Sequence, residues 1–203
     1  MTVSSVSSTT PALTLERRPF VAQLVANRGD DLICISGIGS PCWDLAASGD
    51  HPMNFYLNGA MGSACALGLG LALAQPQKRV IVITGDGEML MALGILATIG
   101  VVAPKNLAIV VLDNQVYLET GAQPTHTAHG VDLAAVARAC TFRNAKTIAA
   151  QSEVDAAVRD AREAEGPSVI VVKIAPDKSK TVLPPLEATY TKHRMREALI
   201  GRP

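Results

Sequence analysis

Residues 79–88 read RVIVITGDGE, and this stretch decides the fold. The run VIVIT is apolar or β-branched throughout, which is typical of a strand that is buried on both faces. The break that follows, Gly85-Asp86-Gly87, lets backbone N–H groups approach an anion at the start of the next helix. The stretch therefore predicts a buried strand that ends in a ligand-binding turn.

Similar apolar runs recur along the chain, separated by segments that favour helices. Strands are predicted at residues 31–36, 55–57, 79–84, 107–112, 147–148 and 168–174, and helices at 20–26, 62–74, 88–100, 132–140, 152–165 and 191–200. This alternation is the pattern of a parallel sheet covered by helices. We therefore expect an α/β fold, a doubly wound parallel sheet with helices on both faces. Residues 113–130 are polar and predict a long loop.

The length of 203 residues fits one large domain with room for tails. Residues 1–16 predict a flexible N-terminal arm and residues 17–203 the folded domain. The N-terminus lacks the basic stretch and apolar core of a secretory signal. The apolar runs at 59–74 and 89–103 are short for a membrane span. The sequence thus predicts no membrane segment.

The composition excludes several other classes of function. Eighteen basic and eighteen acidic residues balance each other, and aromatic residues make up 3% of the chain. Neither feature supports nucleic-acid binding, which needs a basic surface or stacking platforms. The four cysteines form no CxxC pair and have no histidine at metal-ligand spacing, which argues against zinc. Scattered cysteines fit a reducing cytoplasm.

Polar or glycine-rich loops follow several predicted strands, at the edge where such sheets bind ligands. Asp86 at an anion-binding turn is explained by a divalent cation between its carboxylate and a phosphate, and Mg²⁺ prefers such oxygen ligands. Asn114, after the next helix and strand, could bring an amide oxygen to the same metal. Each signal alone has a simpler reading, because GDG also forms plain turns and Asp113-Asn114 is a common turn signal.

Residues 59–62 (GAMG) form a third such loop, before a helix rich in glycine and alanine. Glycine weakens an exposed helix, so these residues suit a place where backbones or a ligand approach closely. Taken alone, Met61 reads as a core residue at a helix start.

Together these motifs resemble the magnesium–diphosphate motif of thiamine diphosphate (ThDP) enzymes, in which GDG is followed, after a helix and a strand, by an Asn pair. Asp113-Asn114 is a common variant of that pair. Residues 85–100 and 105–125 resemble the pyrophosphate-binding (PP) domain of sulfopyruvate and phosphonopyruvate decarboxylases. In that group a TGxQxT stretch follows the Asn, as residues 120–125 do here. The resemblance covers roughly residues 31–174.

The resemblance implies a role for each matching residue. The side chains of Asp86 and Asn114 and the carbonyl of Val116 would ligate Mg²⁺. Met61 would be the apolar wedge that bends ThDP, and the Gly59 carbonyl would accept a hydrogen bond from its pyrimidine amino group. The residues expected at the cofactor are Gly39, Ser40, Gly59, Met61, Gly85, Asp86, Gly87, Glu88, Asn114, Val116 and Tyr117.

Glu88 departs from the serine often found at its position in the family. A carboxylate beside a diphosphate is unfavourable, so we expect its side chain to turn away. Glu119, His126 and His129 lie in the loop after the metal motif and are candidates for acid–base work. A loop histidine is more often merely solvated. We therefore expect three catalytic residues in this chain: Met61, Glu119 and His126.

The resemblance also implies a partner. ThDP catalysis needs a glutamate at the pyrimidine N1′, which in the family belongs to a separate pyrimidine-binding (PYR) domain. This chain is long enough for the PP domain only. Two-subunit members divide the two domains between an α and a β chain, and this chain resembles a β chain. The resemblance implies a PYR-domain α subunit and an α2β2 or larger assembly. Residues 62–74 and 88–100 are candidates for the interface with that subunit. Alternatively, these two segments pack only in the core of this chain.

We therefore expect the β subunit of a ThDP- and Mg²⁺-dependent 2-oxoacid decarboxylase, a cytoplasmic enzyme that converts 3-sulfopyruvate or 3-phosphonopyruvate into an aldehyde and CO2. The alternatives are a subunit of an acetolactate-synthase-like carboligase and a non-catalytic ThDP-binding subunit. A Rossmann dinucleotide domain is disfavoured, because Cys42 stands where the third glycine of GxGxxG would follow Gly37 and Gly39.

Overall fold

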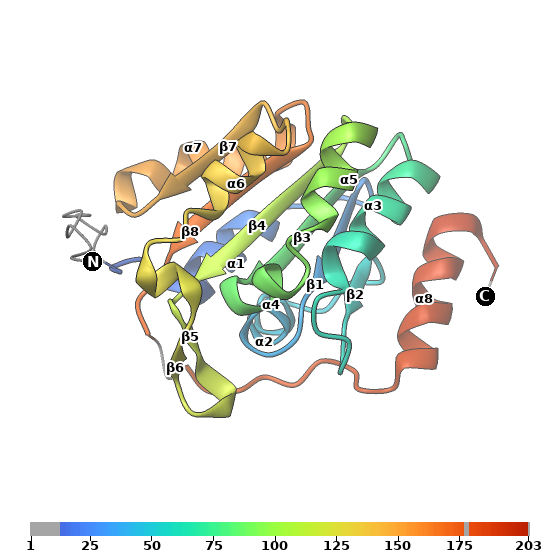
Figure 1. The fold of residues 1–203 in the computed structure, drawn as a ribbon. Helices are drawn as coiled ribbons and strands as arrows, with labels where there is room; N and C mark the ends of the chain where they lie inside the picture. Colours follow the sequence, from blue (N-terminus) through green and yellow to red (C-terminus); the bar gives the residue numbers. More distant parts are fainter. Residues whose placement is uncertain (1–12, 177–178, 203) are drawn as a thin grey trace, which may run out of the picture.

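A parallel sheet forms the centre of the computed structural model, which describes residues 13–176 and 179–202 (Figure 1). Its six strands are, in spatial order, β2 (Asn54–Tyr56), β1 (Leu32–Ser36), β3 (Arg79–Gly85), β4 (Leu107–Asp113), β8 (Ser168–Lys173) and β7 (Asn144–Ile148). All neighbouring strands pair in parallel. The chain runs outward from β1 to β2 and then returns to β3 on the other side of β1. The predicted doubly wound α/β fold is confirmed, and its switch point lies between β1 and β3.

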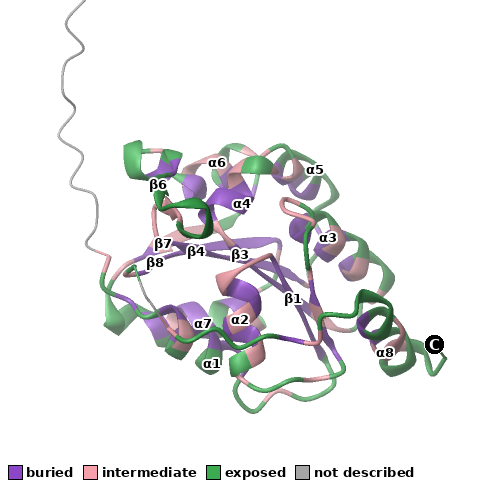
Figure 2. Cartoon of the chain, turned by 90° about the horizontal axis from the view of Figure 1, so that it is seen from below, coloured by how far each residue is buried: buried purple, intermediate pink, exposed green. Residues whose placement is uncertain are grey.

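Helices cover both faces of the sheet (Figure 2). Side chains of β3 reach both cores, Ile81 and Ile83 on one face and Val80 and Val82 on the other, because successive residues of a strand point to opposite sides. The first face is covered by α1 (Arg17–Val25), α2 (Ser40–Ala47) and α7 (Val154–Glu163), and the second by α3 (Ala64–Ala74), α4 (Asp86–Met91), α5 (Ile95–Val102) and α6 (Leu133–Ala139).

The last helix, α8 (Ala188–Ile200), lies beside β2 at the edge of the sheet (Figure 1). Arg194 of this helix forms an ion pair with Asp50, which precedes β2. Among the described residues, no helix is both long and apolar enough to cross a membrane.

Two predicted elements differ from the structure. The single helix expected at residues 88–100 is wrong, because a turn at 92–94 separates α4 from α5. Ala92 leaves the helical conformation there, and Gly94 lowers the helix propensity. The loop at residues 113–130 contains the hairpin β5 (Val116–Tyr117) and β6 (Gln123–Pro124), with the 3₁₀ turns η1 (Leu118–Thr120) and η2 (His126–His129). Strands of two residues are too short to show a periodic pattern.

The N-terminal arm also needs a correction. Leu15 is buried, forms a β-bridge with Ile174, and its carbonyl accepts a hydrogen bond from the N–H of Ala175. Leu15 therefore belongs to the folded domain and not to the arm. Residues 1–12 of the predicted arm lie outside the described residues.

Helix α3 packs on β3 at a contact that requires glycine. A Cβ at Gly68 would lie 2.3 Å from Cγ2 of Val82, whereas a Cβ at Gly70 would meet no atom within 4 Å. We expect Gly68→Ala to lower the free energy of unfolding by about 1–3 kcal/mol through overpacking. The matched variant Gly70→Ala should raise it by about 0.5–1 kcal/mol. Urea unfolding of both variants measures the difference, and equal effects would contradict this packing.

Candidate functional site

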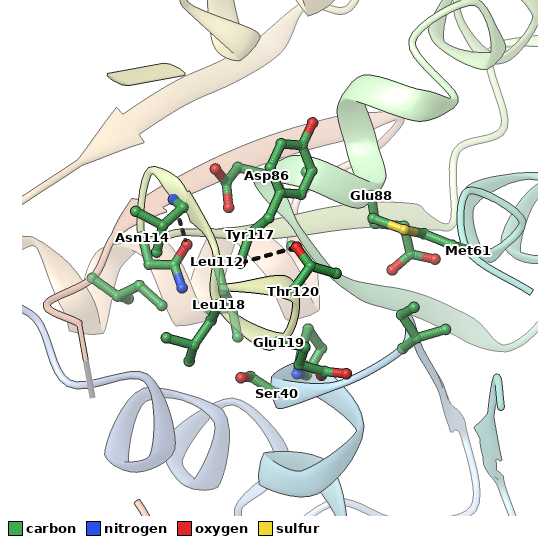
Figure 3. A pocket seen from close by; sticks show the side chains of 16 residues that line it. Ser40, Met61, Asp86, Glu88, Leu112, Asn114, Tyr117, Leu118, Glu119 and Thr120 are labelled. Atoms are coloured by element: carbon green, nitrogen blue, oxygen red, sulfur yellow. Dashed lines mark hydrogen bonds between the residues drawn. The ribbon is translucent and has the colours of Figure 1, made fainter. Parts of the chain in front are cut away.

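A pocket lies at the carboxyl ends of β1, β3 and β4, beside the switch point of the sheet (Figure 3). The pocket is open to solvent on one side, and it lies where doubly wound sheets bind their ligands. The lining residues are Ile38, Ser40, Pro41, Met61, Gly85, Asp86, Gly87, Glu88, Leu112, Asn114, Val116, Tyr117, Leu118, Glu119, Thr120 and Ile174.

Most of the residues predicted from the sequence therefore meet in one pocket. Gly39 borders it, because the carboxylate of Glu119 packs against Gly39. Gly59 does not line the pocket, although Met61 of the same loop does. His126 and His129 are exposed on η2 and are also not lining residues. The structure thus gives no support for His126 as an acid or base at this pocket.

Asp86 follows β3 directly and is buried at the edge of the pocket. Its Oδ2 accepts a hydrogen bond from the Thr125 hydroxyl, and the Thr127 hydroxyl lies 3.3 Å from the same oxygen. Burial raises the pKa of Asp86 to about 6; the Thr125 hydroxyl opposes this and the nearby Asp113 carboxylate adds to it. A buried carboxylate whose partners are hydroxyls and its own backbone N–H is poorly compensated, and a cation would restore the balance.

Asp113, the neighbour of the predicted metal ligand Asn114, is engaged elsewhere. It forms a buried ion pair with Lys173 at the end of the adjacent strand β8, and Thr127 donates to its Oδ1 at 2.8 Å. Lys173 thus neutralises Asp113. Sequence reasoning missed Lys173 and Thr127, and it included Thr125 only as the last residue of the TGxQxT stretch. A lysine that ends the apolar run SVIVVK was the available signal for the first of them.

Asn114 forms a turn that shapes the next wall of the pocket. Its Oδ1 accepts the N–H of Val116 at 3.0 Å, which bends the chain so that Val116 also lines the pocket. An amide oxygen has a second lone pair, which stays available for a ligand. The Asp86 carboxylate, the Asn114 amide and the Val116 carbonyl are hard oxygen donors of the kind that Mg²⁺ prefers. The residues present therefore fit a magnesium ion. The described residues contain no group of three or more His, Cys, Asp or Glu side chains placed for a metal.

Two glycines of the pocket are covered by side chains of the same segment. A Cβ at Gly87 would lie 2.4 Å from Cε1 of Tyr117, and a Cβ at Gly39, whose φ is +69°, would lie 1.9 Å from Oε1 of Glu119. Larger residues at either position would exclude these contacts.

Glu88 lines the pocket on the side away from the predicted metal ligands. Figure 3 shows Glu88 and Met61 on one side of the pocket and Asp86 and Asn114 on the other. The carboxylate accepts hydrogen bonds from the Thr84 hydroxyl and from a backbone N–H, and the side chain is buried.

Comparison with known proteins agrees with this geometry. The family model described as thiamine pyrophosphate enzyme, C-terminal TPP binding domain, matches residues 34–172. Sulfopyruvate decarboxylase subunit beta of Methanocaldococcus jannaschii is 37% identical over 184 residues, which cover 91% of this chain and 97% of the relative. Phosphonopyruvate decarboxylase of Streptomyces viridochromogenes is 39% identical, over 76% of this chain and 38% of that protein. The chain thus spans nearly all of the first relative and well under half of the second.

Solved structures show the same fold. Benzoylformate decarboxylase from Polynucleobacter necessarius superposes with a TM-score of 0.66 at 18% identity, over 84% of this chain and 35% of that one. A Mycobacterium smegmatis protein described as thiamin diphosphate-dependent gives a TM-score of 0.69 at 22% identity, over 87% and 35% of the two chains. The chain belongs to the thiamine pyrophosphate enzyme family and carries its C-terminal TPP binding domain.

Proposed function

We propose that this chain is the β subunit of a heteromeric 2-oxoacid decarboxylase that depends on ThDP and Mg²⁺ and converts 3-sulfopyruvate or 3-phosphonopyruvate into an aldehyde and CO2. The observation that carries the proposal is the match to a sulfopyruvate decarboxylase subunit beta over 97% of that relative. The family match supports the proposal, and so does the pocket, which is lined by Asp86, Asn114 and Val116, the residues that the resemblance assigns to the metal.

The residues of the pocket divide into two ends. At one end, Asp86, Asn114 and the Val116 carbonyl would hold Mg²⁺ between protein and diphosphate. The backbone of the turn at residues 85–88 and of Gly39 and Ser40 would donate to the diphosphate, beside the ring of Tyr117. ThDP held there would supply a carbon nucleophile for the substrate carbonyl and an acceptor for the electrons released when the C–C bond breaks.

At the other end, Met61 would support the bend of the cofactor and the Gly59 carbonyl would orient its pyrimidine. Met61 lines the pocket beside Glu88, away from the metal ligands (Figure 3). Glu119 is the acid–base candidate that lines the pocket and is exposed there, and its carboxylate would hold or move a proton near the substrate. The acid–base role of Glu119 stays a prediction.

We also propose a PYR-domain α subunit as the partner, in an α2β2 or larger assembly. Relatives named subunit beta imply a second subunit. In the described pocket, Asp86 and Glu88 are engaged by hydrogen bonds and Glu119 lies against Gly39, so none of these acids is placed to serve the pyrimidine N1′. The exposed apolar residues of α3, α4 and α5 support a partner surface; they are Leu73, Met91, Val101 and Val102.

The cytoplasmic location stays a prediction. The start of the folded domain at residue 17 also stays a prediction, although the buried Leu15 extends the domain by at least two residues. All four cysteines are free thiols, which fits a reducing compartment.

Met61→Ala is expected to separate binding from turnover. Affinity comes mainly from metal and diphosphate, so the variant, assembled with its partner, should bind ThDP within about threefold of wild type but lose at least about tenfold in kcat. Met61→Leu is the matched control, since it keeps the apolar bulk and should retain most activity. A wild-type kcat in the Met61→Ala variant would contradict the proposal that Met61 supports the bend of the cofactor.

Product analysis tests the proposed reaction against its alternatives. The assembled complex, given ThDP and Mg²⁺, is incubated with 3-sulfopyruvate and, separately, with 3-phosphonopyruvate. We expect CO2 and an aldehyde in equal amounts from at least one of them. A ligated hydroxyketone from pyruvate, with neither substrate consumed, would favour the carboligase. Tight ThDP binding without conversion of any 2-oxoacid would favour the non-catalytic subunit.

A further inference from the structure

The carboxylate of Glu88 lies where three segments of the pocket meet. Glu88 is 4% exposed, and it accepts hydrogen bonds from the Thr84 hydroxyl at 2.9 Å and from the N–H of Gly62 at 3.1 Å. Burial raises the pKa of Glu88, while hydrogen bonds from Thr84 and from the N–H groups of Gly62, Ile38 and Ala64 oppose the rise. One carboxylate therefore connects the end of β3, the loop after β1 and the loop before α3.

The loop after β1 passes very close to this carboxylate. A Cβ at Gly37 would lie 1.7 Å from Oε2 of Glu88, so any residue other than glycine at this position would expel the carboxylate. The backbone of Gly37 is held in turn by a 2.7 Å hydrogen bond from its N–H to the Ile83 carbonyl of β3. The space for Glu88 is thus built by strands β1 and β3.

The loop at residues 59–62 depends on this contact for its conformation. Gly59 and Gly62 both have positive φ, +88° and +90°, and Met61 lies between them. The loop belongs to no helix or strand. The Glu88 carboxylate binds the N–H of Gly62, the residue directly after Met61. The Glu88 carboxylate therefore holds the backbone at the end of the loop from which Met61 enters the pocket, together with a hydrogen bond from the Ser63 N–H to the Ala60 carbonyl.

The bonding pattern requires a carboxylate. The groups around it are hydrogen-bond donors: one hydroxyl and the backbone N–H groups. A carboxylate accepts through both oxygens, whereas a glutamine of the same shape would turn an NH2 group toward one of these donors. Buried donors without an acceptor are costly, so the loop would rearrange.

We propose that Glu88 is a positioning residue whose carboxylate fixes the loop at residues 59–62, and thereby Met61, in the conformation that supports the bent cofactor. Glu88 acts through Met61 and does not bind the cofactor or the metal through its side chain. This inference rests on the proposed function, since it takes Met61 as the cofactor support.

The first test uses the full chain without cofactor. Amide hydrogen exchange at Gly62 is compared among wild type, Glu88→Gln and the control Glu153→Gln. Glu153 does not line the pocket, and its exposed carboxylate also accepts backbone N–H groups, those of Ala149 and Ala150. Exchange at Gly62 should accelerate by about tenfold or more in Glu88→Gln and stay unchanged in the control, because one protecting hydrogen bond is lost.

A second pair of variants keeps the test decisive if Glu88→Gln folds poorly. Thr84→Val removes one donor to the carboxylate and should accelerate exchange at Gly62 in the same direction by a smaller factor. Thr84→Ser keeps the hydroxyl and should restore wild-type exchange. Unchanged exchange at Gly62 in both Glu88→Gln and Thr84→Val would overturn the proposal.

The third measurement is made on the assembled complex. Glu88→Gln should bind ThDP with Mg²⁺ within about threefold of wild type but lose about tenfold or more in kcat, with an altered circular dichroism signal of the bound aminopyrimidine. A loss of ThDP affinity as large as that of an Asp86 variant would show direct binding and overturn the positioning role. An inactive wild-type complex would instead contradict the proposed function and leave the exchange result standing.

Discussion

Asp86→Asn is expected to abolish tight Mg²⁺-dependent ThDP binding and, in the same molecule, to stabilise the cofactor-free chain at neutral pH. The first effect follows from the loss of the charged oxygen ligand among the donors Asp86, Asn114 and Val116. Loss of a residue that only supports a metal ligand costs about 10–100-fold in affinity, so loss of the ligand itself should cost roughly 100-fold or more.

The second effect follows from the buried charge of Asp86. Its pKa is raised from 3.8 to about 6, so the folded chain holds this proton more tightly than the unfolded chain does. Wild-type stability therefore falls as the pH rises from about 4 to about 6 and stays reduced above that range. Asparagine cannot ionise and avoids this loss, which is on the order of 2–3 kcal/mol. The gain of Asp86→Asn should be full above pH 6 and vanish below pH 4.

Calorimetry measures the affinity for ThDP. Urea unfolding of the cofactor-free chain at pH 4 and pH 7 measures the change in stability. Asp31→Asn is the matched control, because Asp31 is exposed and precedes β1 at the opposite edge of the sheet. It should change neither quantity. Unchanged ThDP affinity in Asp86→Asn would remove the metal assignment, and a destabilised variant at pH 7 would show that the carboxylate has a structural role in the free chain.

The strands and the turn that bears Asp86 could be predicted from the sequence for a physical reason. Strands buried on both faces must be apolar throughout, so runs such as those of β3 and β4 stand out from the polar loops. Their parallel arrangement brings the ends of β3 and β4 to one edge, which is why Asp86 and Asn114 line the same pocket. Both conclusions depend on local pattern and on topology alone.

The division between α4 and α5 could not be predicted in this way. The stretch MLMALGILATIG is apolar throughout, and Gly94 alone does not end a helix, because an isolated glycine is tolerated within one. The turn at residues 92–94 allows α4 to lie over the end of β3 while α5 packs on the sheet as a separate helix. Tertiary packing therefore determines this boundary, as it does for the short hairpin of β5 and β6.

The partners of the acidic residues were also beyond sequence reasoning. The sequence predicts that Glu88 turns away from the diphosphate, but it does not predict the contact with the N–H of Gly62, which joins residues far apart in the chain. The same holds for the pair of Asp113 and Lys173. His126 was a candidate because it follows the metal motif, but the 3₁₀ turn η2 leaves it exposed outside the pocket. Spacing along the chain does not report which way a loop side chain points.

The second large effect is expected on assembly. The chain alone should not decarboxylate any 2-oxoacid, because Asp86 and Glu88 of its pocket are engaged by hydrogen bonds and Glu119 lies against Gly39, which leaves the pyrimidine N1′ without a glutamate. Addition of a PYR-domain α subunit should restore the reaction by supplying a glutamate at the pyrimidine N1′. Replacement of that glutamate by glutamine should lower kcat by about 10²–10⁴-fold, the usual contribution of an acid–base group, without dissociating the complex.

The most direct test is an aldehyde-coupled assay of decarboxylation with ThDP and Mg²⁺, run on the purified chain, on the α subunit and on their mixture. Size-exclusion chromatography of the same samples reports assembly. We predict turnover of 3-sulfopyruvate or 3-phosphonopyruvate by the mixture, in the fractions that contain both chains, and none by either chain alone. Robust turnover by the 203-residue chain alone would contradict a site shared between two subunits.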